Sequence, residues 1–99
     1  MIKTVFKASD EVPSGRSSND ILGSLMAEVG ELAEEVSIQS GHIGKDPGSD
    51  GVLGESVDVI LCALDMTRVN FPEVTEEDVI KIAEKKCAKW LYMRDKWNG

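Results

Sequence analysis

The sequence predicts an all-α protein, a helical bundle of about three long helices per chain that is completed by dimerisation. Apolar residues recur with the helical period in three segments, at about residues 19–40, 52–70 and 76–96. Segments that contain glycine or proline separate them. The middle segment is apolar around most of its circumference, which is typical of a buried helix. Because three helices of one chain can hardly bury such a helix, we expect a partner subunit.

The composition indicates a single globular domain that spans residues 1–99. Of the 99 residues, 41% are hydrophobic and 29% are charged, which is typical of a globular chain and unlike a disordered one. We expect the only two cysteines, Cys62 and Cys87, to be reduced core residues of a cytoplasmic protein; the alternative is one disulfide between them. The first ten residues lack the apolar run of a signal peptide, and no run approaches the ~20 apolar residues that cross a bilayer.

The charge limits the possible partners. The formal net charge is −7, which argues against a nucleic-acid polymer, because such a partner needs a basic patch. We therefore expect neither nucleic acid nor a membrane as partner. A nucleotide remains compatible with this charge if metal ions bridge its phosphates to the protein.

The first 18 residues have the least regular pattern. Their apolar residues predict a short strand or a docked turn, and these are Ile2, Val5 and Phe6. Residues 10–18 contain Pro13, Gly15 and three serines, which predicts a loop. A side chain at the end of this loop is expected to cap the next helix, and the candidates are Ser17, Ser18 and Asn19.

The first long helix is expected to run from about Asn19 to Ser40, with Gly41 as its C-terminal stop. Its apolar stripe comprises Ile21, Leu22, Leu25, Val29, Leu32 and Val36. At ~100° per residue, three acids fall within about 60° of one another beside this stripe, and they are Glu28, Glu31 and Glu35. Glu34 points further toward water. Residues 41–51, with four glycines and a proline, form a flexible connection.

The second long helix, at about residues 52–70, carries acids within an otherwise apolar segment. Four polar or weakly polar residues share one stripe, and they are Glu55, Asp58, Cys62 and Asp65. A buried acid needs a partner or a metal ion. Asp65 is either an outer metal ligand or the ion-pair partner of Arg68, and we favour the ion pair.

The third long helix follows Phe71-Pro72, which ends the second one. Thr75 is the expected cap, and the acids of the first turn are interpreted as structural: Glu76, Glu77 and Asp78. The apolar stripe comprises Val79, Ile82, Ala83, Cys87, Trp90 and Leu91. The C-terminal half carries five cations, which either interact favourably with the helix dipole or bind phosphates of a ligand. They are Lys85, Lys86, Lys89, Arg94 and Lys96.

Two pairs of acids carry the functional interpretation, Glu28-Val-Gly-Glu31 and Glu55-Ser-Val-Asp58. Residues three apart lie on one face of a helix, so each pair points to one place. Two carboxylates ~4 Å apart repel by about 4 kcal/mol at an effective dielectric of ~20. Divalent cations remove this repulsion, and an oxygen-only ligand set favours Mg²⁺ or Mn²⁺. Solvated acids are the alternative, which fits Glu34 better than the acids of the apolar second helix.

These motifs resemble those of the MazG-like, all-α nucleoside triphosphate pyrophosphohydrolases. The signature of that family is E-x-x-E, a spacer of variable length, and then E-x-x-D. The local sequence Glu-Val-Gly-Glu-Leu-Ala-Glu and the apolar run after the second motif are also typical of this family. The resemblance covers roughly residues 19–97.

The resemblance implies a helical bundle that forms a homodimer, or a homotetramer built from two dimers. It implies that a (d)NTP is hydrolysed between its α- and β-phosphates to the monophosphate and pyrophosphate. It also implies Mg²⁺ held by Glu28, Glu31, Glu55 and Asp58, with Mn²⁺ as a substitute.

Two positions depart from the family pattern. Many relatives carry a second glutamate just before the first motif, where this chain has Ala27, so we consider Glu31 or Glu35 as the general base. Relatives also often show Lys-x-x-x-Asn in the last helix, where this chain has Lys86 and Trp90. Candidate substrate contacts on this helix are Lys86, Lys89, Trp90 and Arg94. For Trp90 we favour a core position over stacking on a base.

Two other classes of function compete with this interpretation. The net charge and small size also fit a non-catalytic acidic helical protein that binds or regulates a basic partner. A ferritin-like di-iron protein fits poorly, because that class uses Glu-x-x-His on its helices. The only histidine, His42, lies in the predicted connection, where we expect it to be polar surface.

Overall fold

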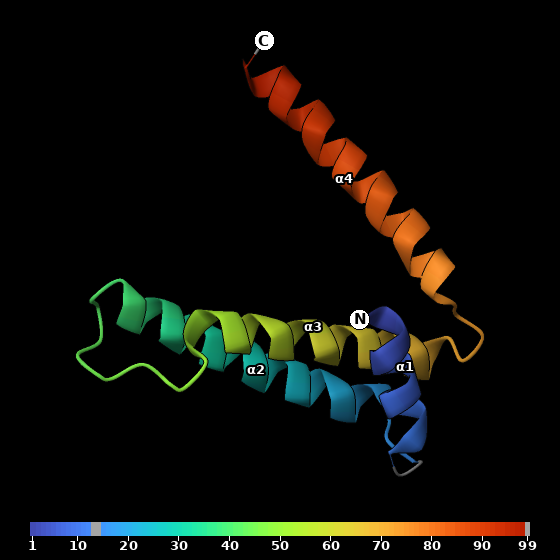
Figure 1. Ribbon diagram of the computed structural model, residues 1–99, viewed down its shortest axis with the longest axis horizontal. Coiled ribbons are helices and arrows are strands. Elements are labelled where there is room, and N and C mark those ends of the chain that lie inside the picture. Colours follow the sequence, from blue (N-terminus) through green and yellow to red (C-terminus); the bar gives the residue numbers. More distant parts are fainter. Residues whose placement is uncertain (13–14, 99) are drawn as a thin grey trace.

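The computed structural model describes residues 1–12 and 15–98, which form four helices (Figure 1). These are α1 (Ile2–Glu11), α2 (Ser18–Gln39), α3 (Gly51–Asn70) and α4 (Glu76–Asn98). The prediction of an all-α protein is confirmed, and the described residues contain no strand. The three long helices lie close to their predicted bounds, and α1 is an additional helix.

The predicted strand or docked turn at the N-terminus is wrong, because these residues form α1. Ile2, Val5, Phe6 and Ser9 have the spacing of one helical face, and they are the least exposed residues of α1. Phe6 is 6% exposed, and the guanidinium of Arg68 on α3 lies 5.4 Å from its ring centre. The predicted loop is shorter than expected, since residues 10 and 11 belong to α1. Pro13 and Ser14 of that loop lie outside the described residues.

Helix α2 has the predicted ends. The Ser17 hydroxyl accepts a hydrogen bond from the Asp20 N–H at 3.1 Å, and the Asp20 carboxylate accepts one from the Ser17 N–H at 2.9 Å. This reciprocal capping box fixes the first turn. After the last turn, Gly41 has a φ of +80° and its N–H donates to the Ile38 carbonyl at 3.1 Å. That left-handed conformation explains why glycine stops the helix.

Helix α4 begins as predicted. The Asp78 carboxylate accepts a hydrogen bond from the Thr75 N–H at 3.0 Å, and the Thr75 hydroxyl accepts one from the Asp78 N–H at 3.1 Å. The Phe71 residue that precedes Pro72 caps the C-terminal end of α3.

The helices form an open arrangement rather than a closed bundle. Helices α2 and α3 lie side by side and run in opposite directions, α1 packs against α3, and α4 projects away from that layer (Figure 1). The radius of gyration is 16.4 Å, whereas a compact domain of about 100 residues has a radius of about 13 Å. Among the described residues, the apolar ones less than a tenth exposed are Phe6, Ile21 and Leu64.

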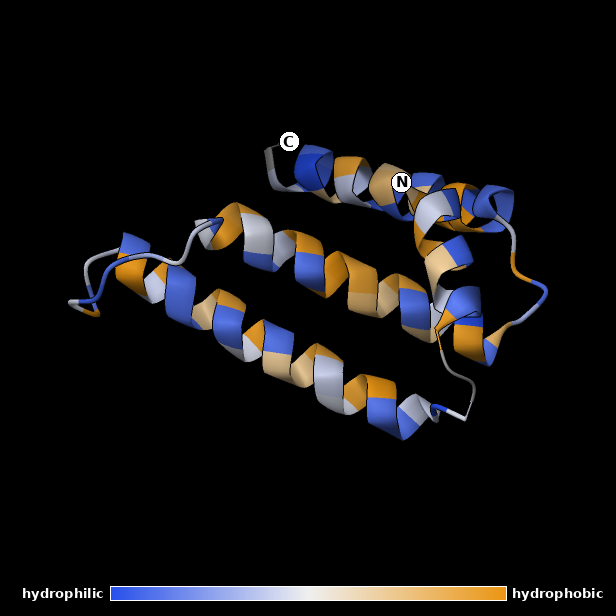
Figure 2. Cartoon of the chain, turned by 60° about the horizontal axis from the view of Figure 1, so that its bottom comes forward, coloured by the Kyte–Doolittle hydropathy of each residue, from blue (hydrophilic) through white to orange (hydrophobic). Residues whose placement is uncertain are grey.

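Large apolar side chains are therefore exposed along α3 and α4. Figure 2 shows that hydrophobic residues occur along the length of both helices. Leu53 of α3 is 76% exposed, and Trp90 and Trp97 of α4 are 73% and 81% exposed. As expected, one chain leaves part of the apolar α3 exposed. The prediction that Cys87 is a core residue is wrong for the single chain. Both thiols are free, with Cys62 half-buried and Cys87 exposed. No described helix has a stretch apolar and long enough to cross a membrane.

Candidate metal centre

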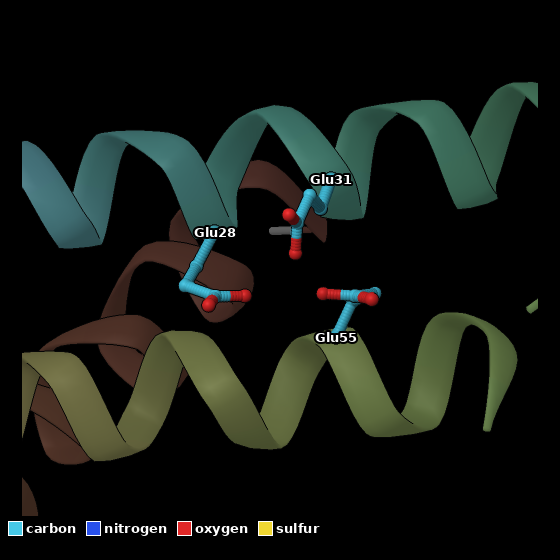
Figure 3. A group of neighbouring side chains, drawn as sticks. All are labelled: Glu28, Glu31 and Glu55. Carbon is cyan, nitrogen blue, oxygen red and sulfur yellow. The ribbon is translucent and has the colours of Figure 1, made fainter.

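Three of the four predicted metal ligands converge between α2 and α3. Glu28 and Glu31 extend from one face of α2 toward α3, and Glu55 extends from α3 toward them (Figure 3). One carboxylate oxygen of each lies within 4.8 Å of the others. Their sequence spacing explains this, because residues three apart lie one turn apart on the same face of α2.

The carboxylates of Glu28 and Glu55 are partly shielded from water. Both residues are half-buried, while Glu31 is exposed. The Oε2 atom of Glu28 and the Oε2 atom of Glu55 are buried without a hydrogen-bond partner among the described residues. A buried oxygen without a partner costs free energy. A bound cation or a proton would remove that cost.

The carboxylates also resist ionisation together. Burial, followed by the charges of Glu31, Asp58 and Glu28, raises the pKa of Glu55 from 4.5 to about 7. Burial and then a hydrogen bond and charge from Glu31 also raise the pKa of Glu28. Both shifts have the causes expected where like charges share a poorly solvated space.

Asp58, the fourth predicted ligand, lies beside this group rather than within it. It follows Glu55 by one turn of α3, and its charge contributes to the raised pKa of both Glu28 and Glu55. Its carboxylate is not among the oxygens that lie within 4.8 Å of one another. The four acids therefore share one region, with three of them in closer contact.

The donor set suits a hard divalent cation. The group offers carboxylate oxygens, without nitrogen or sulfur, which are the ligands that Mg²⁺ and Mn²⁺ prefer. The two buried oxygens without partners are the observation in favour of an ion, since acids at a surface are common without one.

Two other acids of α2, Glu34 and Glu35, contact the connection to α3. Glu35 Oε1 accepts a hydrogen bond from the Gly48 N–H at 2.7 Å. Glu34 pairs with Lys45 at 2.6 Å and remains solvent-accessible, as predicted. Glu35 was a candidate general base, and the structure places one of its oxygens on the connection instead of in the group of three acids.

The predicted ion pair between Asp65 and Arg68 is wrong. Arg16 donates to both carboxylate oxygens of Asp65, and the Ser9 hydroxyl donates to Oδ1. Arg68 instead pairs with Asp10 at 2.9 Å. The reason is the unpredicted α1, which packs on the C-terminal half of α3 and brings new partners to it. Burial acts to raise the pKa of Asp65, but the hydrogen bonds from Arg16 and Ser9 outweigh it and hold that pKa below its ordinary value.

The predicted substrate contacts on α4 are not brought to the acids within one chain. These residues are Lys86, Lys89, Trp90 and Arg94, and they lie on the helix that projects away from α2 and α3 (Figure 1). Arg94 pairs with its neighbour Asp95 at 2.6 Å. Trp90 is 73% exposed, so the core position that we favoured for it is wrong within the single chain.

The sequence also gave no indication of a cavity between α1 and α3. Its volume is about 350 Å³, and its lining comprises Thr4, Val5, Ala8, Ser9, Val12, Arg16, Leu61, Cys62 and Asp65. The helical spacing of Ile2, Val5, Phe6 and Ser9 was the signal that would have predicted α1, which forms one wall.

Comparison of the chain with protein-family models, curated proteins and solved structures gives no match. The functional interpretation therefore depends on the residues of the site and on the resemblance of its two motifs.

Proposed function

We propose that the protein is a Mg²⁺-dependent nucleoside triphosphate pyrophosphohydrolase that converts a (d)NTP to the (d)NMP and pyrophosphate. The observation that supports this most directly is the convergence of Glu28, Glu31 and Glu55 from the two motif helices, with Asp58 alongside. In this reaction one water molecule is consumed and the P–O bond between the α- and β-phosphates breaks. The two motifs correspond in type and spacing to those of the MazG-like family.

The acids have distinct roles in this proposal. Glu28, Glu31, Glu55 and Asp58 hold Mg²⁺, which supplies positive charge for the triphosphate and makes water more acidic when bound. Glu31 is the exposed member of the group of three, so it is the residue we favour for accepting the proton of the attacking water. Glu35 is less suitable, because its Oε1 accepts the hydrogen bond from the Gly48 N–H.

We also propose that the active form is a homodimer or homotetramer in the cytoplasm. Exposed Leu53, Trp90 and Trp97 supply apolar surface that a second copy would cover. Residues 85–97 hold five cations and one acid, in a chain whose net charge is −7. The basic half of α4 is therefore complementary to the acidic α2–α3 layer of a second copy. The two free thiols agree with a reducing compartment.

The proposal is tested by incubating the protein with each common NTP and dNTP in the presence of Mg²⁺ and measuring pyrophosphate. We expect release from at least one nucleotide and none in EDTA. A folded protein that releases pyrophosphate from none of them contradicts the proposal.

A second candidate is a non-catalytic helical protein that binds or regulates a partner. The exposed aromatic residues of α4 favour this function, because Trp90 and Trp97 are typical of contact surfaces. It requires no cation, so Mg²⁺ would leave the melting temperature unchanged. A melt with and without Mg²⁺ distinguishes it from the enzyme.

A further inference from the structure

The cavity between α1 and α3 has the size and lining of a small-molecule site. Its volume of about 350 Å³ falls within the ~300–1,000 Å³ of typical ligand pockets. Its sides are apolar, formed by Val5, Ala8, Val12 and Leu61. Arg16, Asp65 and Ser9 form a polar group in the same lining. Apolar sides with a few fixed polar groups suit a flat heteroaromatic ring.

The cavity continues the stripe of α3 that holds the acids. Asp58, Cys62 and Asp65 follow one another along this stripe, and Cys62 and Asp65 line the cavity. At 1.5 Å per residue, Cys62 lies about 6 Å and Asp65 about 10 Å along the axis from Asp58. Burial and the charges of Glu28, Asp65 and Asp58 raise the pKa of the Cys62 thiol. Cys62 therefore lies close both to the acids of the candidate metal centre and to Asp65 in the cavity. A nucleoside triphosphate with its phosphates at the acids is long enough to reach the cavity.

Arg16 and Asp65 retain hydrogen-bonding capacity that the described part of the chain does not use. Arg16 uses one Nη1–H on Asp65 Oδ2, and it uses Nη2 on Asp65 Oδ1 and on the Ser9 carbonyl. A guanidinium has five N–H donors, so its Nε–H and a second Nη1–H have no partner among residues 1–12 and 15–98. Asp65 accepts three hydrogen bonds, from Arg16 and from the Ser9 hydroxyl, out of about four that a carboxylate can accept. The Arg16 donors and the Asp65 acceptor therefore lie next to each other in the lining of the cavity.

We propose that this cavity binds the base of the substrate and that Arg16 and Asp65 select a base with both a carbonyl oxygen and an N–H donor on its pairing edge. This inference rests on the proposed pyrophosphohydrolase function. Arg16 donates to the carbonyl oxygen, and Asp65 accepts from the N–H. Uracil, thymine, cytosine and guanine meet this requirement. Adenine has no carbonyl oxygen and leaves the Arg16 donors without a partner, which costs binding energy.

The test compares two tryptophan variants in neighbouring positions of α1. Ala8 lines the cavity, so Ala8→Trp fills it. Lys7 is exposed and outside the lining, so Lys7→Trp is the matched control. The kcat and KM for dUTP, dTTP, dCTP, dGTP and dATP are measured with Mg²⁺ for all three proteins. The Mg²⁺-induced rise in melting temperature confirms that each variant is folded and retains the acids' site.

We expect wild-type kcat/KM for dATP to be at least tenfold below that of the best other nucleotide. We expect Ala8→Trp to lower kcat/KM for that best nucleotide at least tenfold, mainly through KM, and Lys7→Trp to change it less than twofold. A conservative variant, Asp65→Asn, should alter the ratio of kcat/KM between bases.

The outcomes separate this inference from the function on which it rests. A wild-type protein that hydrolyses none of the nucleotides overturns the proposed function and the inference with it. An active wild-type protein that prefers dATP, or whose kcat/KM is the same in Ala8→Trp, overturns the assignment of the cavity alone.

Discussion

Replacing Glu55 by glutamine should stabilise the metal-free protein and weaken its response to Mg²⁺. The folded protein raises the pKa of Glu55 from 4.5 to about 7. Between these two pH values the folded state retains a proton that the unfolded state has lost. The free energy of unfolding of the metal-free protein therefore falls as the pH rises through this window. Glu55→Gln removes the ionisable group and should remove this part of the pH dependence.

The raised pKa of Glu55 also determines how many protons metal binding should release. About half of the metal-free molecules hold a proton on Glu55 at pH 7, and about a tenth hold it at pH 8. A carboxylate must be deprotonated to bind a metal ion, so Mg²⁺ displaces these protons. Glu55 should thus contribute about half a proton per bound ion at pH 7 and about a tenth at pH 8. The variant should lose this contribution.

The assay combines thermal melts with calorimetry in buffers of different ionisation enthalpy. A ligand at 100 times its Kd stabilises the folded state by ~2.7 kcal/mol. In a domain of this size, that corresponds to a rise in melting temperature of roughly 10 °C or more. At pH 8, Glu55→Gln should melt above the wild type in EDTA and show a smaller rise with Mg²⁺.

Glu34→Gln provides the matched control on the neighbouring helix. Its carboxylate pairs with Lys45 on the exposed connection, and an exposed ion pair contributes only ~0–1 kcal/mol. This control should keep the Mg²⁺ response of the wild type. If Glu55→Gln instead melts below the wild type in EDTA and keeps the full Mg²⁺ response, Glu55 does not belong to a cation site.

Three further predictions concern catalysis, the end of α2 and self-association. Glu55→Gln and Asp58→Asn should each abolish pyrophosphate release while circular dichroism shows unchanged helix content. Wild-type rates in both variants would show that these acids do not bind the metal ion. Gly41 has a φ of +80°, so Gly41→Ala should destabilise the fold by about 1–2 kcal/mol, measured by urea unfolding, and unchanged stability would argue against that backbone conformation. Leu53→Ser and Trp97→Ser remove the most exposed large apolar side chains of α3 and α4 and should shift sedimentation toward the monomer; an unaltered oligomer would place the interface elsewhere.

Local sequence signals predicted the ends of the helices well. The cap of α2, the cap of α4 and the stop at Gly41 each depend on hydrogen bonds between residues a few positions apart. Such contacts form whenever the local segment is helical, so the order of residue types is enough to predict them. The helical spacing of Ile2, Val5, Phe6 and Ser9 would have predicted α1, but this helix has only 10 residues and its short apolar pattern was interpreted as a strand or docked turn.

Contacts between distant segments were harder to predict. Asp65 has Arg68 within one turn of α3, yet it pairs with Arg16 across 49 positions of the sequence. That choice depends on where α1 packs, which the pattern of α3 does not contain. The exposure of Trp90 was likewise unpredictable, because a helical apolar stripe does not specify whether its own chain or another copy covers it.

The sequence by itself determined that the protein is helical and which acids share a helical face, because both follow from the fixed periodicity of the α-helix. Only the tertiary structure decided that Glu28, Glu31 and Glu55 approach within 4.8 Å while Asp58 stands beside them. It also decided that α1 forms one wall of a cavity beside α3. The physical reason is that the packing of one helix on another depends on side chains from both, and no single segment of the sequence carries that information.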